Sequence, residues 1–275
     1  MIELPEAAVI AWQMNKELKG KKIIACNCGN SPHKWVFYKH KPGEFKRLLN
    51  GKTIKGVTAE GKWVYVSLPN DQVLLFGEMG GKILWHKNRN KLPEKYHFML
   101  ELDNQACVSV TVKGWGFIHL LKKSQISIME YAEHGYSPID KGFTFEYFTK
   151  LVGADEEGSR KSVKMFVISQ PRIKGIGNGY LQDILFRAGI HPTRQIADIN
   201  AKETRKLYDA ITKTMDEAIK KGGRDDERDF YNNPGTYQRT LDKRAKGQPC
   251  PICKTTIKKT QYLGGASYFC PKCQV

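Results

Sequence analysis

The sequence lacks any long hydrophobic run. Its 275 residues contain no uninterrupted apolar stretch of about 18 or more, the length that a helix needs to span a bilayer. The N-terminus also lacks the basic and then apolar segments of a secretory signal peptide. Internal repeats and low-complexity segments are absent as well. We therefore expect an intracellular protein with no membrane partner.

The sequence is poor in cysteine patterns that would form a disulfide framework. It has seven cysteines, an odd number, and an intracellular protein rarely keeps disulfides. Cys26 and Cys28 lie two residues apart but have no second pair of matching spacing, and Cys107 is isolated. We interpret these three as plain thiols. The other four form a cluster near the C-terminus.

Acidic residues are also scarce. The chain has 45 lysines and arginines against 28 aspartates and glutamates, which gives a formal charge of +17. An excess of this size indicates a polyanionic partner. The basic residues are mixed with aromatics and glycines, as in GEFKRLLNGKTIKG and KTTIKKTQYLGG. This mixing favours nucleic acid over a membrane surface, although any single lysine run could be an ordinary solvated surface.

The first element that the sequence predicts is a helix. Pro5 is expected at its first position and Glu6 in its first turn, where an acidic side chain favours the helix dipole. Gly20 follows where a C-terminal cap would lie. The apolar positions between them repeat at helical spacing: Ala7, Ile10, Ala11, Met14 and Leu18.

The composition and the hydrophobic periodicity of the rest of the chain change twice. Residues 21 to about 120 contain short β-branched and aromatic segments separated by turn signals, which predicts an antiparallel β-sandwich. Helical periods follow from about residue 128, and a polar linker leads to a cysteine-rich tail. The fold class is therefore α+β and multidomain. We predict a β-sandwich over residues 1–127, a helical domain over 128–240 and a small metal-binding tail over 241–275.

The cysteine cluster has the spacing Cys250-x2-Cys253-x16-Cys270-x2-Cys273. Two such pairs supply four thiolates for a tetrahedral Zn²⁺, and the residues between them can form one hairpin. So short a tail cannot bury its own core, whereas zinc can supply roughly 10–16 kcal/mol. Four cysteine ligands leave no open coordination position, so we predict one structural zinc. The hairpin also carries lysines and no acid, which suits a position along phosphates.

A second motif is GIGNGYLQDILFRAGIHP, residues 175–192. Glycines that open a helix direct unpaired backbone N–H groups and the positive end of the helix dipole at an anion. Asn178 adds a side-chain donor in the same turn. The alternative is a tight turn without a ligand. The basic residues nearby, Lys164, Arg172 and Lys174, argue against this alternative.

Together, four motifs resemble the formamidopyrimidine-DNA glycosylase / endonuclease VIII family. They are ELPE at the start, PEKYHFMLEL, GIGNGYLQDILFRAGIHP and CPIC…YFCPKCQ, in family order. The resemblance implies an N-terminal sandwich, a helix-two-turn-helix domain and a C-terminal zinc finger, with double-stranded damaged DNA as the partner. It also implies excision of oxidised bases and cleavage of the abasic site. We expect a monomer in the cytoplasm, associated with the nucleoid if the protein is bacterial.

The resemblance assigns DNA contacts to individual residues. Lys62 matches the family's phosphate-binding lysine and Asn178 its helical-turn asparagine, while Lys164 adds a base close to that turn. Met79 in GEMGG matches the methionine that inserts into the duplex. Trp115 in KGWGF falls where a phenylalanine wedge is usual and is an aromatic substitute for it.

The catalytic positions depart from the family pattern. Family members use an N-terminal proline amine as the nucleophile, and Ile2 occupies that position here. Removal of methionine requires a small second residue, so we expect Met1 to stay and its amine to lie up to about 3.3–3.6 Å further out. Glu3, the family's proton-shuttling carboxylate, and Glu6 are both retained.

Two further departures concern arginines of the family. Its phosphate-binding arginine in the finger aligns with Gly265. Its arginine beside the wedge aligns with Gly114, and the adjoining Lys113 could replace it.

Three functions stay open at this point. The first is a DNA glycosylase and abasic-site lyase with Ile2 at the nucleophile position and Glu3, Glu6 and Lys62 in the active site. The second is a DNA-lesion binder that kept the fold and zinc but lost the nucleophile. The third is an RNA-binding protein.

Overall fold

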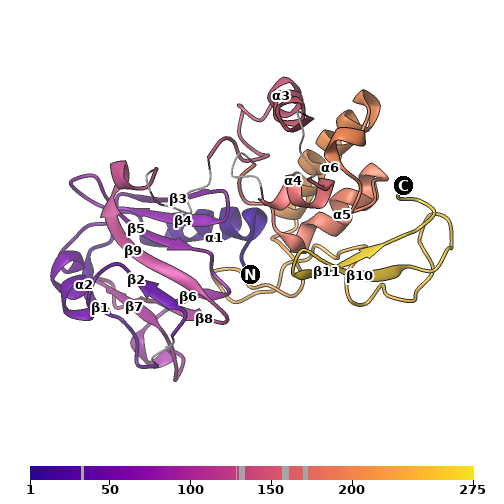
Figure 1. Ribbon diagram of the computed structural model, residues 1–275. Helices are drawn as coiled ribbons and strands as arrows, with labels where there is room; N and C mark the ends of the chain where they lie inside the picture. The colour runs from indigo at the N-terminus through magenta and orange to yellow at the C-terminus, as the bar shows by residue number, and fades with distance from the viewer. Residues whose placement is uncertain (32–33, 128, 130–133, 157–160, 170–172) are drawn as a thin grey trace. The chain divides into compact units, whose positions relative to one another are not determined.

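The computed structural model describes residues 1–31, 34–127, 129, 134–156, 161–169 and 173–275. The chain divides into two compact units (Figure 1). The first unit comprises Met1–Ala132 and Ile219–Tyr237, and the second comprises Glu133–Ala218 and Gln238–Val275. Residues 219–237, which we placed in the helical domain from sequence, thus belong to the compact unit of the sandwich. The three-domain boundaries remain a prediction.

The first unit is built on two sheets. One has the order β1-β7-β8-β6 and is antiparallel throughout, and the other has the order β2-β9-β5-β4-β3. The predicted antiparallel sandwich is confirmed, with one exception: β2 pairs with β9 in parallel. The rings of Phe76 and Phe98, one from each sheet, lie 5.9 Å apart in the core between them. The strands are β1 (Ile23–Asn27), β2 (Val36–Tyr38), β3 (Gly56–Glu60), β4 (Trp63–Ser67), β5 (Gln72–Gly77), β6 (Gly81–His86), β7 (Phe98–Leu102), β8 (Cys107–Val112) and β9 (Gly116–Lys122).

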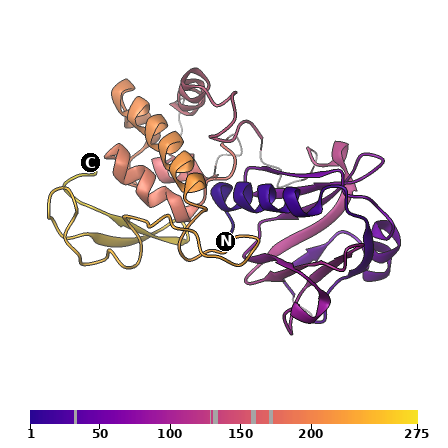
Figure 2. The same ribbon diagram turned by 180° about the vertical axis from the view of Figure 1, so that it is seen from behind.

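Two helices complete this unit. Helix α1 (Leu4–Leu18) begins one residue before the predicted start and buries its apolar face against β3 and β4 (Figure 2). Helix α2 (Pro42–Leu49) was not predicted, because its short basic pattern lies between segments of strand composition. Its fully buried Phe45 packs edge-on against Phe98 of β7, with 5.6 Å between ring centroids.

The segment QVLLFGEMGGKILWH does not form one continuous strand. It splits into β5 and β6, which belong to different sheets. At Gly80 and Gly81, an added Cβ would collide with the carbonyl oxygens of Lys113 and Thr111, so only glycine fits there. The chain therefore crosses between the sheets at this point and places Glu78 and Met79 in the crossing.

The second unit contains the predicted helices and hairpin. The amphipathic patterns correspond to α3 (Phe145–Glu156), α5 (Asn178–Ala188) and α6 (Ala201–Lys220), while the short α4 (Val163–Ser169) was not predicted. Strands β10 (Lys258–Tyr262) and β11 (Gly265–Phe269) form the hairpin between the cysteine pairs. In the part of the chain that the structure describes, 3-10 helices cover Arg89–Lys91, Lys123–Gln125 and Ile196–Asp198. Among the described residues, no helix combines the length and hydropathy needed to cross a bilayer.

Candidate nucleic-acid interface and metal centre

The N-terminus is held by contacts within the first unit. The Met1 ammonium lies 2.6 Å from Glu227 Oε1, and the Met1 side chain is 43% exposed. Ile2 is buried in the sandwich core, and its backbone N–H donates to the Met79 carbonyl at 2.8 Å. At the position that the family reserves for a reactive amine, a chain that keeps Met1 therefore has a peptide nitrogen.

Arg224 forms ion pairs with both retained glutamates. Its Nη1 donates to Glu3 Oε1 at 3.1 Å, its Nε donates to Glu6 Oε1 at 3.2 Å, and its Nη2 donates to the Met1 carbonyl at 2.6 Å. All three charged side chains are at most 5% exposed. Glu3 and Glu6 also form a capping box at the start of α1, so they stabilise the helix as well. Sequence reasoning did not identify Arg224, which lies more than 200 residues from either partner.

Lys62 has a carboxylate partner that the sequence did not reveal. Its Nζ lies 2.8 Å from Glu78 Oε1, and the Trp63 indole donates to the same oxygen at 3.3 Å. Glu78 has a φ of 50°, in the left-handed region that side chains rarely adopt. This conformation in the crossing between β5 and β6 brings the buried carboxylate to the lysine. A phosphate at Lys62 would have to share or displace Glu78.

The predicted wedge residues lie beside the same crossing. The Gly80 N–H donates to the Trp115 carbonyl at 3.1 Å, and the Lys113 N–H donates to the Gly80 carbonyl. Lys113 and Trp115 are exposed, whereas Met79 is 1% exposed and belongs to the core. Insertion of Met79 into a duplex would therefore require its side chain to leave the core.

These contacts connect the first-unit residues that the sequence singled out. Ile2 binds Met79, whose neighbours in the crossing contact Lys62 on one side and the Lys113–Trp115 turn on the other. Glu3 and Glu6 follow Ile2 directly along the chain. The structure thus joins the predicted catalytic and wedge residues into one continuous strip, which we call the crossing strip: residues 1–6, 62, 78–80 and 113–115.

In the second unit, the start of α5 contacts the hairpin. Gly177 caps the helix and Asn178 is its first residue. Asn178 Nδ2 and Gln182 Nε2 both donate to the Ala266 carbonyl, at 3.3 and 3.1 Å. Gln182 Oε1 accepts from the Tyr268 N–H at 3.3 Å. The helical turn is therefore fixed to the zinc-binding hairpin, and Gln182 is a connecting residue that sequence reasoning missed.

Lys164 makes a second connection to the hairpin. Its side chain is buried, and its Nζ donates to the Tyr262 carbonyl at 2.7 Å and to Ser267 Oγ at 3.0 Å. Burial lowers the pKa of this ammonium. A Cβ at Gly265 would lie 3.4 Å from Asn178 Nδ2 and 3.8 Å from Lys164 Nζ, so this glycine lies against both donors. Arg172, also singled out from sequence, lies outside the described residues.

The four cysteines converge as the spacing predicts. Their sulfur atoms all lie within 4.8 Å of one another, with 3.8 Å between Cys250 and Cys273 and 3.4 Å between Cys253 and Cys270. A tetrahedron with Zn–S bonds of about 2.3 Å has edges of about 3.8 Å, so the donor set fits Zn²⁺. Among the described residues, these four cysteines are the side chains that lie close enough together to hold a metal ion. Cys26, Cys28 and Cys107 are free thiols.

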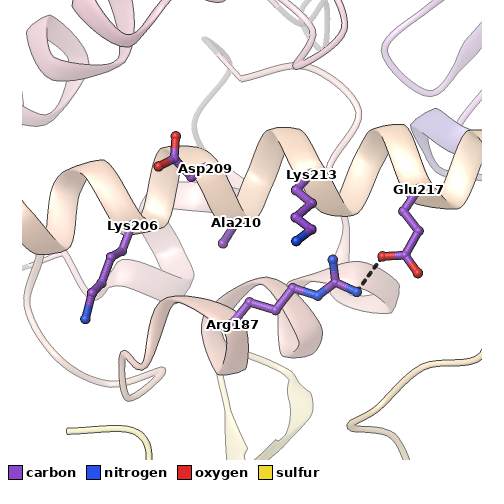
Figure 3. Close-up of a pocket in the computed structure, with 6 residues that line it drawn as sticks. All are labelled: Arg187, Lys206, Asp209, Ala210, Lys213 and Glu217. Atoms are coloured by element: carbon purple, nitrogen blue, oxygen red, sulfur yellow. Dashed lines mark hydrogen bonds and ion pairs between the residues drawn. The ribbon is translucent and has the colours of Figure 1, made fainter.

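A separate hollow of about 560 Å³ lies between α5 and α6 (Figure 3). Arg187 extends along it and binds Glu217 at 2.7 Å, with Lys213 beside the pair. Two acidic and three basic side chains line this hollow, so their charges largely offset one another. It shares no residue with the sites predicted from sequence.

The β-sandwich, the helical turn and the four-cysteine hairpin together define a multidomain protein with a site for one structural zinc ion. Three family models match in sequence order. Residues 1–113 match the formamidopyrimidine-DNA glycosylase N-terminal domain, residues 135–228 its H2TH domain, and residues 247–275 the zinc finger found in FPG and IleRS.

Complete proteins match as well. The chain is 31% identical to the formamidopyrimidine-DNA glycosylase of Roseiflexus sp. (strain RS-1) over the full length of both, and 30% identical to that of Bacillus cereus (strain ATCC 10987 / NRS 248) over 84% of each. A Lactococcus lactis Fpg in complex with abasic-site DNA is 25% identical, with 99% of both chains covered and a TM-score of 0.86. The chain belongs to the formamidopyrimidine-DNA glycosylase / endonuclease VIII family. The resemblance, the three-part architecture and the single structural zinc are thereby confirmed.

Proposed function

We propose that this protein binds damaged double-stranded DNA in base excision repair. The observation that carries the proposal is the crossing strip, in which Lys62, Lys113 and Trp115 are joined through the segment Glu78–Gly80. These are the residues that the family resemblance assigns to phosphates and to the vacated base stack. The Lactococcus lactis relative was crystallised with abasic-site DNA, which supports the same partner here.

The charge balance supports a phosphate-contacting role. Each lysine that meets a phosphate releases counterions, so binding should weaken steeply with salt. In the second unit, the positive end of the α5 helix dipole lies at Asn178 and favours a phosphate there. Asn178 and Lys164 flank the space next to Gly265, and we assign the second phosphate contact to this position.

The test is equilibrium binding to a short duplex over a range of salt concentrations. Lys62→Ala combined with Asn178→Ala should weaken binding and reduce the slope of log K against log salt by about one for each phosphate that the variant no longer neutralises. Lys150→Ala is the matched control, because Lys150 is a 73% exposed lysine paired with Glu146 on α3. A double variant with the wild-type slope would contradict the assignment.

A second candidate function is abasic-site cleavage through the N-terminal amine. The observation in its favour is the exposed ammonium group of Met1, a residue of the crossing strip, which lies beside Glu227. Against it, the amine lies one residue beyond the family position, and an error of even about 1 Å can cost on the order of a hundredfold when geometry sets the rate. Arg224 also holds the Glu3 carboxylate in a buried ion pair. We therefore assign lesion binding, with little or no cleavage.

Borohydride reduction in the presence of an abasic-site duplex tests this choice. We expect little or no trapped covalent complex. An abundant cross-link that disappears when the N-terminus is blocked would establish the lyase instead. Intact mass comes first, because loss of Met1 would place the amine of Ile2 next to the Met79 carbonyl, at the family position.

We also propose that the protein acts as a monomer in the cytoplasm, on nucleoid DNA in a bacterial cell. Light scattering of the free protein and of its DNA complex should give one chain per duplex. RNA of the same sequence should compete weakly with the damaged duplex. Stronger competition by RNA would favour the RNA-binding alternative.

A further inference from the structure

Three exposed aromatic side chains lie together on the first unit. Trp35 precedes β2, Phe37 lies within it, and Trp115 precedes the parallel neighbour β9 (Figure 1). The Gly116 N–H donates to the Trp35 carbonyl at 3.0 Å, which fixes the two strand starts side by side. The rings of Phe37 and Trp115 meet edge to face with centroids 6.5 Å apart. We call these three residues the aromatic platform.

The aromatic platform lines an apolar cavity of about 470 Å³, together with Gly114. The exposed fractions of its members are 50% for Trp35, 45% for Phe37 and 40% for Trp115. Large aromatic residues gathered at the surface are typical of binding sites, and this volume is within the range of small-ligand pockets. Among the described residues that line the cavity, none carries a carboxylate or an amide side chain. The cavity therefore suits a flat group recognised by its faces.

Positive charge borders this apolar surface. Lys34, Lys39 and Lys113 are exposed, and residues 34–39 and 113–117 contain no acid. Lys34 Nζ lies 5.1 Å from the centroid of the Trp35 ring. An apolar aromatic surface edged by cations fits a flat base attached to a phosphate backbone, the pattern of single-stranded nucleic-acid sites.

We propose that the aromatic platform stacks an unpaired nucleobase of the bound DNA. This inference rests on the proposed DNA-binding function and adds Trp35 and Phe37 to it. A paired base is already stacked on both faces, and extruding it costs about as much as one stacking contact returns. A base that is already unpaired, as in a bulge or opposite a lesion, is therefore the preferred occupant.

The identity of the base should matter little. Gly114 has a φ of 82°, a conformation that strains any other residue, so the turn itself keeps a side chain out of the position where the family has an arginine. Apart from the indole N–H groups of the two tryptophans, the side chains in the lining are apolar, so the platform contacts faces that all four bases share. Stacking of this kind tolerates any sequence.

The experiment compares two duplexes that differ by one unpaired nucleotide. The wild-type protein should bind the bulged duplex at least about tenfold more tightly than the paired duplex. Its affinities for duplexes with a bulged A, C, G or T should agree within about threefold. Trp35→Leu combined with Phe37→Leu should reduce this preference to near one while leaving the paired duplex and its salt slope unchanged. Trp35→Phe should keep it. With 2-aminopurine as the bulged base, the wild type should quench its fluorescence and the leucine variant should not.

Trp12→Leu is the matched control, since Trp12 is a 68% exposed tryptophan on α1 that does not line the cavity. Thermal melting of each variant checks that the fold is intact. A leucine variant that keeps the bulge preference would overturn the inference and leave the proposed function standing. A wild type that binds neither duplex would overturn both. Binding of paired DNA without any bulge preference would assign the platform to another partner, such as a protein.

Discussion

Replacement of Arg224 by methionine should lower the free energy of unfolding of the first unit more than any single substitution at its surface. The arginine side chain is 5% exposed and lies between Glu3 and Glu6, which are 5% and 2% exposed. Methionine has a similar length and no charge. The variant therefore leaves two buried carboxylates without their cation while it disturbs the packing little.

The magnitude follows from the loss of a buried ion pair. Four hydrogen bonds of the guanidinium disappear: two to Glu6, one to Glu3 and one to the Met1 carbonyl. Removal of one partner from a buried pair costs about 3–5 kcal/mol, because the remaining charge is desolvated and uncompensated. For a unit of this size, that loss lowers the melting temperature by about 6–20 °C.

Tryptophan fluorescence measures this unit alone, because all five tryptophans belong to it: Trp12, Trp35, Trp63, Trp85 and Trp115. Urea titrations of the full chain therefore report its unfolding separately. Arg89→Met is the matched control. Arg89 is 62% exposed and pairs with Glu101 at 3.4 Å, so its loss should cost no more than about 1 kcal/mol.

One result would refute this reasoning: a stability of Arg224→Met within about 1 kcal/mol of the wild type, as in the Arg89 control.

Three further predictions concern charge and metal. Glu78→Gln should tighten DNA binding, because Lys62 loses the carboxylate that competes with a phosphate for its ammonium group; an unchanged affinity would mean that Lys62 meets no phosphate. Burial is the main reason why the pKa of His119 is lowered from 6.5 to about 4 in the folded chain. As the pH falls, the unfolded chain therefore binds a proton at His119 before the folded chain does. The free energy of unfolding should fall by up to about 3 kcal/mol as the pH falls through that interval. His119→Gln should flatten that fall, and identical acid limbs would contradict the assignment. Metal analysis should find one zinc per chain and none in Cys253→Ser; a hairpin that stays folded after chelation would disprove the structural role.

Local patterns allowed much of the fold to be predicted from sequence. The zinc ligands follow from a spacing within 24 residues, and α1 follows from its apolar period and its start signals. The sandwich could be predicted because segments of strand composition alternate with turn residues over about 100 residues. Helix α2 was missed because its short amphipathic pattern holds only one large buried aromatic, Phe45, among charged neighbours.

Long-range contacts could not be predicted. Arg224 meets Glu3 across 221 positions in the chain, and nothing in either local sequence indicates the partner. The contact between Lys62 and Glu78 depends on a left-handed backbone at the point where the chain changes sheets. Trp35 and Trp115 became neighbours through a parallel strand pair that the antiparallel prediction did not include. The residues were visible in the sequence, but their pairing depends on topology.

The most direct measurement of the central claim is the affinity ratio between two matched duplexes. One carries a stable abasic-site analogue and the other is fully paired, at the same salt concentration. The protein should bind the abasic duplex more tightly, and Lys62→Ala with Asn178→Ala should weaken both complexes. Equal affinity for the two duplexes, or no binding to either, would contradict the assignment of this protein to DNA damage.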